Sequence, residues 1–146
     1  NITLLLVGPL EERDELTSVT VNLIKNTPNI IFTGNVDRED LPYYYSLMDT
    51  LVLPTYREGL GTVTLEASSI GLPVLVSGHT GSRDAVIDKT TGEFIKVNTN
   101  DIFNKVEKLI KNRKLASYYG ENGRKHMIKN FAQNIIWEEI NRKVYK

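Results

Sequence analysis

The stretch TLVLPTYREGLGTVTLEASSIGLPVLV, residues 50–76, decides the fold. It begins with a short apolar run at residues 50–53, which predicts a buried strand. Residues 62–70 predict a helix, and Gly71 stands at the left-handed position that often ends a helix. Residues 73–76 are again apolar and strand-like. A strand, a helix and a second strand in this order indicate a βαβ unit, and therefore a parallel sheet.

The same alternation continues on both sides of this unit. Apolar runs predict strands at residues 2–7, 30–33 and 93–97, and helical spacing predicts helices at residues 11–26, 37–48, 82–86, 101–111, 114–131 and 133–145. Five short strands separated by helices predict an α/β fold of the Rossmann-like, doubly wound kind, with a parallel sheet, helices on both faces and further C-terminal helices. The length of 146 residues is typical of one domain.

Composition excludes several kinds of site and partner. The chain has no cysteine, which excludes disulfides and thiolate metal sites and favours a cytoplasmic location. Eighteen basic residues balance eighteen acidic ones, so the net charge indicates no nucleic-acid partner. No Asp-x-Asp pair and no His cluster indicates a divalent cation, so we expect neither a metal nor a cofactor.

The two ends of the sequence carry further expectations. Asn1 is not preceded by an initiator Met, which suggests a piece of a longer protein. No apolar run reaches the roughly 20 residues of a membrane span, and no signal peptide is visible. From Lys105 to Lys146, basic side chains outnumber acidic ones. This excess fits either a solvated face of the terminal helices or a peripheral contact with the anionic inner face of a membrane.

The most informative loop is the one after the strand at residues 50–53. In open parallel sheets, ligands bind in the crevice beyond the carboxyl ends of the strands. Here the sequence EGLG, residues 58–61, stands just ahead of the helix start near Thr62. The first turn of a helix leaves backbone N–H groups unpaired at the positive end of the helix dipole. Because glycine at positions 59 and 61 removes the side chains that would keep a phosphate away, this loop is predicted to cradle an anion.

Two carboxylates flank the predicted cradle. Glu58 lies just ahead of the helix, and Glu66 lies about 6 Å along the helix axis from Thr62, with a side chain that leans back toward the helix start. An ionised carboxylate only accepts hydrogen bonds, so both glutamates are predicted to bind hydroxyl groups on either side of a phosphate. A nucleotide sugar has this layout. The alternative is structural: Glu58 favours the helix dipole, and Glu66 pairs with a nearby arginine.

At this motif the chain resembles the C-terminal, donor-binding domain of the retaining glycosyltransferases with the GT-B fold, glycosyl transferases group 1 of the family 4 type, which carry two glutamates separated by seven residues. The resemblance rests on PTYREGLG (54–61), LEA (65–67), GLPVLV (71–76), GSRDAV (81–86), TGEF (91–94), IFTGNV (31–36) and LPYYYSLMD (41–49), and it covers nearly the whole chain. The family more often has Gly-Ile-Pro-Glu-Val-Val at residues 81–86, so the identity of the donor sugar stays open.

The resemblance implies a role for each matched residue. Glu58 would be the catalytic residue and would accept hydrogen bonds from hydroxyls of the transferred sugar, and Glu66 would hold the ribose diol. Backbone N–H groups of residues 60–63 would hold the β-phosphate, and residues 34–36 would meet the base. The implied donor-binding set is Gly34, Asn35, Val36, Glu58, Gly59, Leu60, Gly61, Thr62, Val63 and Glu66.

The resemblance also implies that the chain is half of an enzyme. The acceptor-binding N-terminal domain, and the arginine and lysine that clamp the diphosphate in the family, would precede residue 1. The whole enzyme would transfer a hexose from a nucleotide sugar, with retention, to a glycan or lipid-linked acceptor in capsular polysaccharide or lipopolysaccharide biosynthesis. The isolated chain is expected to bind the donor without completing the reaction.

Other functions fit the sequence less well. The segment GLGTVT, residues 59–64, lacks the third glycine of a dinucleotide-binding dehydrogenase. A nucleotide-sugar epimerase half-domain needs catalytic acids and bases that the chain scarcely offers, and a non-catalytic nucleotide-binding module of the receiver type needs an acidic cluster after the first strand. His79 and His126 are isolated: His79 follows a strand end and could touch the ligand, whereas His126 is expected at the surface.

Overall fold

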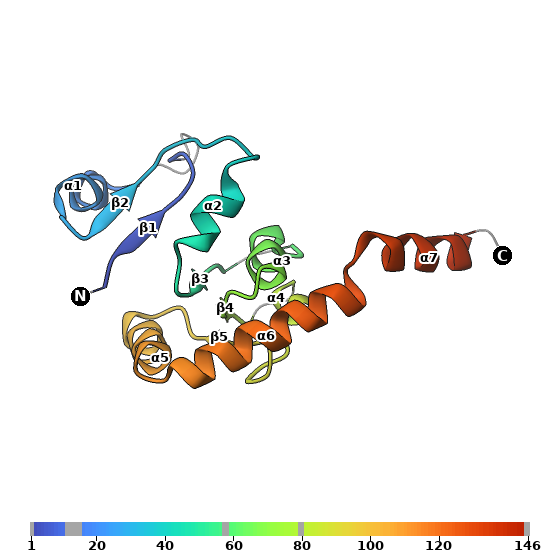
Figure 1. The fold of residues 1–146 in the computed structure, drawn as a ribbon. Helices are drawn as coiled ribbons and strands as arrows, with labels where there is room; N and C mark the ends of the chain where they lie inside the picture. Colours follow the sequence, from blue (N-terminus) through green and yellow to red (C-terminus); the bar gives the residue numbers. More distant parts are fainter. Residues whose placement is uncertain (1, 11–15, 57–58, 79–80, 145–146) are drawn as a thin grey trace. The chain divides into compact units, whose positions relative to one another are not determined.

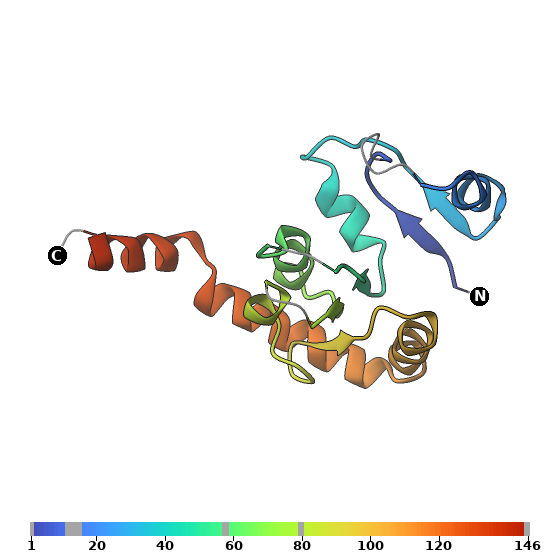
Figure 2. The same cartoon turned by 180° about the vertical axis from the view of Figure 1, so that it is seen from behind.

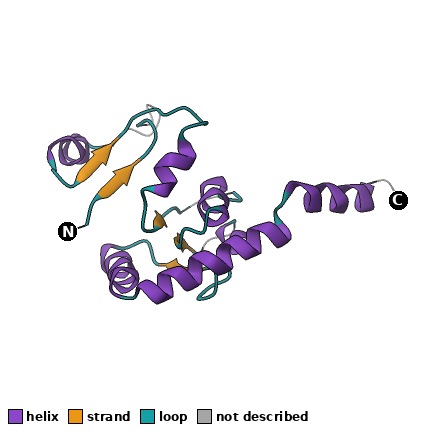
Figure 3. Ribbon diagram, viewed as in Figure 1, coloured by secondary structure: helices purple, strands orange, loops and turns teal. Residues whose placement is uncertain are grey.

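The computed structural model describes residues 2–10, 16–56, 59–78 and 81–144. The chain divides into two compact units, Asn1–Met48 and Asp49–Lys146. Helices alternate with parallel strands in both units (Figures 1 and 3), so the predicted α/β fold is confirmed. The five described strands are grouped into two parallel sheets, one of two strands and one of three.

The first unit contains β1 (Leu4–Leu6), α1 (Ser18–Asn26), β2 (Ile30–Phe32) and α2 (Leu41–Ser46). The two strands are parallel, and each is followed two residues later by a glycine with a positive φ, Gly8 after β1 and Gly34 after β2. The N–H of Gly8 donates a hydrogen bond to the carbonyl of Gly34 over 3.0 Å. The segments that follow β1 and β2 therefore stay paired just beyond the carboxyl ends of the strands. The φ values there, 124° at Gly8 and 67° at Gly34, favour glycine.

The second unit contains β3 (Leu51–Leu53), α3 (Thr62–Ser69), β4 (Val74–Ser77), α4 (Ser82–Ala85), β5 (Gly92–Ile95), α5 (Thr99–Lys111), α6 (Arg113–Asn130) and α7 (Gln133–Val144). Its strands are parallel in the order β3-β4-β5. The central strand β4 is buried along its whole length. This explains its continuous apolar sequence, because a strand covered on both faces has no solvent-facing side that would favour polar residues.

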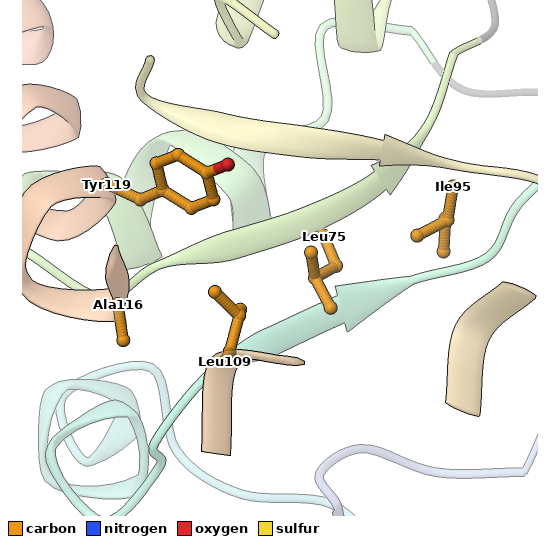
Figure 4. Packing of buried hydrophobic residues seen from close by; sticks show 5 residues of the cluster. All are labelled: Leu75, Ile95, Leu109, Ala116 and Tyr119. Atoms are coloured by element: carbon orange, nitrogen blue, oxygen red, sulfur yellow. The ribbon is translucent and has the colours of Figure 1, made fainter. Parts of the chain in front are cut away.

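The core of the second unit lies between the sheet and helices α5 and α6 (Figure 4). Leu75 of β4 and Ile95 of β5 pack with residues of the two helices, namely Leu109, Ala116 and Tyr119. Figures 1 and 2 show α6 running beside α3 and β5 in both views, and α6 contacts each of these two elements. Helix α6 therefore fixes the position of α3, the helix at the predicted site.

Two contacts with α6 anchor the C-terminal end of α3. An added Cβ on Gly120 of α6 would come within 2.0 Å of the carbonyl oxygen of Gly71, which follows α3 with a φ of 84°. The guanidinium of Arg124 donates a hydrogen bond to the carbonyl of Ser69 over 2.9 Å, where a positive charge suits the helix dipole. Gly71 therefore ends the helix as predicted, and the N-terminal end of α3 carries no such anchor from α6 among the described residues.

A charged cluster joins β5 to the two long helices. Glu93 is 6% exposed, accepts a hydrogen bond from Lys108 of α5 over 2.7 Å, and lies 3.5 Å from the Nζ atom of Lys105. The hydroxyl of Tyr119 on α6 donates to the same carboxylate over 3.2 Å. Burial alone raises the pKa of Glu93, but Lys108, Lys105 and Tyr119 together hold it below its usual range. Burial and the charge of Glu93 raise the pKa of Tyr119 to about 12.

Candidate functional site

The start of α3 presents backbone amides beyond the carboxyl end of β3. Gly61 precedes the helix in the left-handed conformation, with φ 66° and ψ 65°. Its carbonyl accepts hydrogen bonds from the N–H groups of Thr64 at 2.8 Å and of Leu65 at 3.3 Å. The N–H groups of Thr62 and Val63 lie ahead of these bonds, and neither donates to another residue in the part of the chain that the structure describes. The helix start can therefore offer two amides to an anion.

Glu66 lies on the outer face of the same helix. The opposite face of α3 packs into the unit through three buried residues, Thr64, Ala67 and Ser68. Thr62 and Glu66 are separated by one turn on the other face, where Thr62 is exposed and Glu66 is half-buried. Glu66 therefore lies on the same helix as the two amides, one turn from Thr62, and its role at the site stays a prediction.

The other residues of the predicted loop are exposed where the structure describes them. Glu58, the predicted catalytic residue, lies outside the described residues. Gly59 is exposed. Leu60 is 45% exposed and Val63 is 36% exposed, although both are apolar. Two apolar side chains beside bare amides would suit the hydrophobic surface of a sugar or base, which a purely structural loop would not require.

Two side-chain hydrogen bonds hold the end of β4, one to the segment that follows β3 and one to helix α4. The hydroxyl of Ser77, the last residue of β4, donates to the carbonyl of Thr55 over 2.5 Å. The Nε atom of Arg83 in α4 donates to the carbonyl of Gly78 over 2.8 Å. The sequence predicts a strand at residues 73–76 and a helix at residues 82–86, but it could not show these two bonds, because they join residues 22 and 5 positions apart.

The residues predicted to meet the base belong to the first unit and are described with it. Gly34 has a φ of 67°, and an added Cβ would meet no atom within 4 Å. Its conformation, and not close packing, therefore requires glycine. Asn35 is exposed and Val36 is half-buried.

The two histidines add no ligand to the described site. His79 lies outside the described residues. His126 was expected at the surface, and this is wrong: it is half-buried, its Nε2 atom is buried without a partner among the described residues, and its ring packs against Phe131 with the centroids 5.6 Å apart. Burial, and then the charge of Lys129, lower the pKa of His126. Helical spacing located the α6–α7 junction to within a residue, but it did not show that the ring of Phe131 packs on His126.

Among the described residues, no group of three or more His, Asp or Glu side chains is placed to hold a metal ion. No described helix combines the length and the apolar character that crossing a membrane requires. Surface hollows of about 400 and 540 Å³ lie along α6 and α7, and both are lined by exposed and half-buried residues of these helices.

Comparison with known proteins gives a consistent result. Residues 1–126 match the family model of glycosyl transferases group 1. The capsular polysaccharide biosynthesis glycosyltransferase CapM of Staphylococcus aureus is 35% identical over 141 residues, which are 96% of this chain and 37% of CapM. The sucrose-phosphate synthase of Thermosynechococcus elongatus is 26% identical, with a TM-score of 0.81 over 98% of this chain and 38% of that one. HepE of Anabaena, solved in complex with UDP, has a TM-score of 0.87 at 19% identity over 99% of this chain and 41% of HepE.

Proposed function

The chain belongs to the glycosyl transferases group 1 family and has the fold of one half of a GT-B glycosyltransferase, and from that premise we propose that it is the part of the enzyme that binds a nucleotide-sugar donor. The observation that carries this proposal is the start of α3. Two amides without a partner among the described residues stand at the positive end of a helix dipole, directly after a left-handed glycine. A diphosphate is the part of such a donor that this arrangement suits.

The same arrangement supports a role in the chemical step. When the bond between the sugar and the diphosphate breaks, negative charge grows on the β-phosphate while the sugar gains oxocarbenium character, as in glycoside hydrolysis. The amides of Thr62 and Val63 would stabilise that leaving group without reorganisation. By resemblance, Glu66 would hold the ribose, Glu58 would hold the transferred sugar as the catalytic residue, and residues 34–36 would meet the base. We propose transfer with retention and without a bound metal.

The rest of the enzyme would supply the acceptor site. The chain spans about two fifths of the length of the relatives that it matches. Helix α7 has no buried residue and exposes Ile136, Trp137 and Ile140 along one stripe, a surface that suits packing against the N-terminal domain of the same enzyme. We propose that the complete protein works in the cytoplasm on surface polysaccharide or lipopolysaccharide, with the basic C-terminal segment near the membrane, and that the 146-residue chain alone is inactive.

Calorimetry with UDP, GDP and ADP, each with and without an attached sugar, tests the proposal. We expect one nucleoside diphosphate to bind in the micromolar to millimolar range, and no sugar transfer by the isolated chain. Equal, negligible heats for all ligands would contradict a donor-binding role. A nucleotide-sugar epimerase would convert the sugar nucleotide without an acceptor, so such turnover by the complete protein would favour the epimerase alternative.

A further inference from the structure

Arg83 is fixed at the edge of the sheet where α3 begins. Its Nε atom is bound to the carbonyl of Gly78, the residue that follows β4. Ser77 in turn binds the carbonyl of Thr55, at the beginning of the loop that leads from β3 to α3. Helix α4, which contains Arg83, also contacts α3. The arginine therefore belongs to the same set of strand ends as the amides of Thr62 and Val63.

Most of the guanidinium of Arg83 is left for another partner. The side chain is exposed, and its two terminal nitrogens donate to no other residue in residues 2–10, 16–56, 59–78 and 81–144. The hydrogen bond from Nε to Gly78 restricts the direction of the group. A planar guanidinium held in this way binds the oxygens of a phosphate or a carboxylate in pairs, with less loss of entropy than a mobile lysine.

Few positive charges stand in the described sequence on either side of the start of α3. From Leu51 to Asp88, Arg83 is the one described residue with a cationic side chain, while Glu66, Asp84 and Asp88 are acidic. Arg124 of α6 also contacts α3, but at its other end, where it binds the carbonyl of Ser69. A helix start contributes only about half an elementary charge, and its effect is confined to the first turn. An anionic donor beside Glu66 would therefore be repelled unless a further positive charge stood nearby.

We propose that Arg83 binds an oxyanion of the donor and so determines which donors the site accepts. The proposal rests on the donor-binding function above and adds to it a specificity-determining residue. The oxyanion has two possible sources, the diphosphate itself or a carboxylate on the transferred sugar. Gly78 serves as the positioning partner, because its carbonyl fixes the direction of the arginine.

Substitution of Arg83 in the 146-residue chain tests this assignment. Arg83→Gln removes the charge, Arg83→Lys keeps it, and Lys125→Gln removes an exposed charge on α6 as the control. Calorimetry with UDP and GDP should show binding about tenfold weaker for Arg83→Gln, as expected for loss of one charge-assisted hydrogen bond, with partial recovery in Arg83→Lys. The affinity of Arg83→Gln should also depend less on salt, and uridine and guanosine, which have no phosphate, should bind unchanged.

A comparison of UDP-glucuronate, whose sugar carries a carboxylate, with UDP-glucose, whose sugar carries none, shows whether Arg83 binds the diphosphate or the sugar. If Arg83→Gln weakens only UDP-glucuronate, the oxyanion is the carboxylate of the sugar, and the assignment of Arg83 stands. Equal affinities of the wild type and Arg83→Gln for every ligand would overturn it. Equal weakening of nucleosides and diphosphates would also overturn it, because Arg83 would then act only on the shape of the loop. If the wild-type chain binds no nucleotide at all, the proposed donor-binding function is wrong. That result differs from the two outcomes that would overturn only the assignment of Arg83.

Discussion

At the scale of the residue, Gly61 determines where the candidate site lies. Its φ of 66° is in the left-handed region, where any other residue except Asn or Asp is strained. Its carbonyl accepts the first hydrogen bonds of α3, from Thr64 and Leu65. Gly61 therefore determines both where the first turn of α3 begins and which two N–H groups, those of Thr62 and Val63, precede its first hydrogen bonds.

Substitutions of the two predicted glutamates, Glu58 and Glu66, should affect the binding of different parts of the donor. Glu66→Ala should weaken the binding of a nucleoside diphosphate about tenfold, because the carboxylate assigned to the ribose diol is lost. Glu58→Ala should leave that affinity nearly unchanged and reduce discrimination between sugar nucleotides. Calorimetry of both variants with UDP, GDP and their glucose and mannose derivatives measures the two effects, with Glu121→Gln on the exposed face of α6 as the control. The reverse pattern would mean that the two roles are exchanged.

The sequence predicted the positions that follow from local geometry. Gly61 and Glu66 are five residues apart, so spacing alone placed them at the start and in the second turn of one helix, as the structure has them, while their roles stay predictions. The sequence could not predict side-chain contacts that depend on how the elements pack. The bond from Arg83 to Gly78 and the bond from Arg124 to Ser69 depend on how α4 and α6 pack, which no periodicity encodes.

At the scale of the element, the predicted strands and helices agree with the structure to within four residues at each end, except at the start of α1, where residues 11–15 lie outside the described residues. The helix predicted over residues 62–70 begins at Thr62, directly after Gly61, and ends at Ser69. Helix α1 begins later than predicted, at Ser18, because the hydroxyl of Thr17 accepts a hydrogen bond from the N–H of Thr20 and caps the helix there. The division of the strands between two units follows from packing and had no local signal.

The contact of α5 and α6 with β5 should depend on pH through Glu93. Its pKa is below the usual range in the folded chain, so its stabilising effect is present above the ordinary pKa, near 4.5, and is lost as the pH falls through the lower, folded value. Glu93→Gln should lower the free energy of unfolding at pH 7 by about 2 kcal/mol. It should also weaken the fall in stability between roughly pH 5 and pH 3.

Urea unfolding of the wild type and of Glu93→Gln across this pH range measures both effects. Asp101 also has a lowered pKa, through its hydrogen bond with the N–H of Lys96, so the difference between the two proteins is the informative quantity. Glu121→Gln controls for loss of an exposed charge. If Glu93→Gln unfolds with the stability and pH dependence of the wild type, the cluster does not hold the helices to the sheet.

At the scale of the whole molecule, the central claim is that the amides at the start of α3 bind a diphosphate. The most direct measurement is a titration of the isotope-labelled chain with UDP and GDP, followed through the amide resonances by NMR, with uridine and guanosine as ligands without phosphate. We predict that the diphosphates shift the amides of Thr62 and Val63 most in the second unit, and that the nucleosides leave these two unchanged. Binding of a diphosphate with its largest shifts elsewhere in that unit, and none at Thr62 or Val63, would contradict the account.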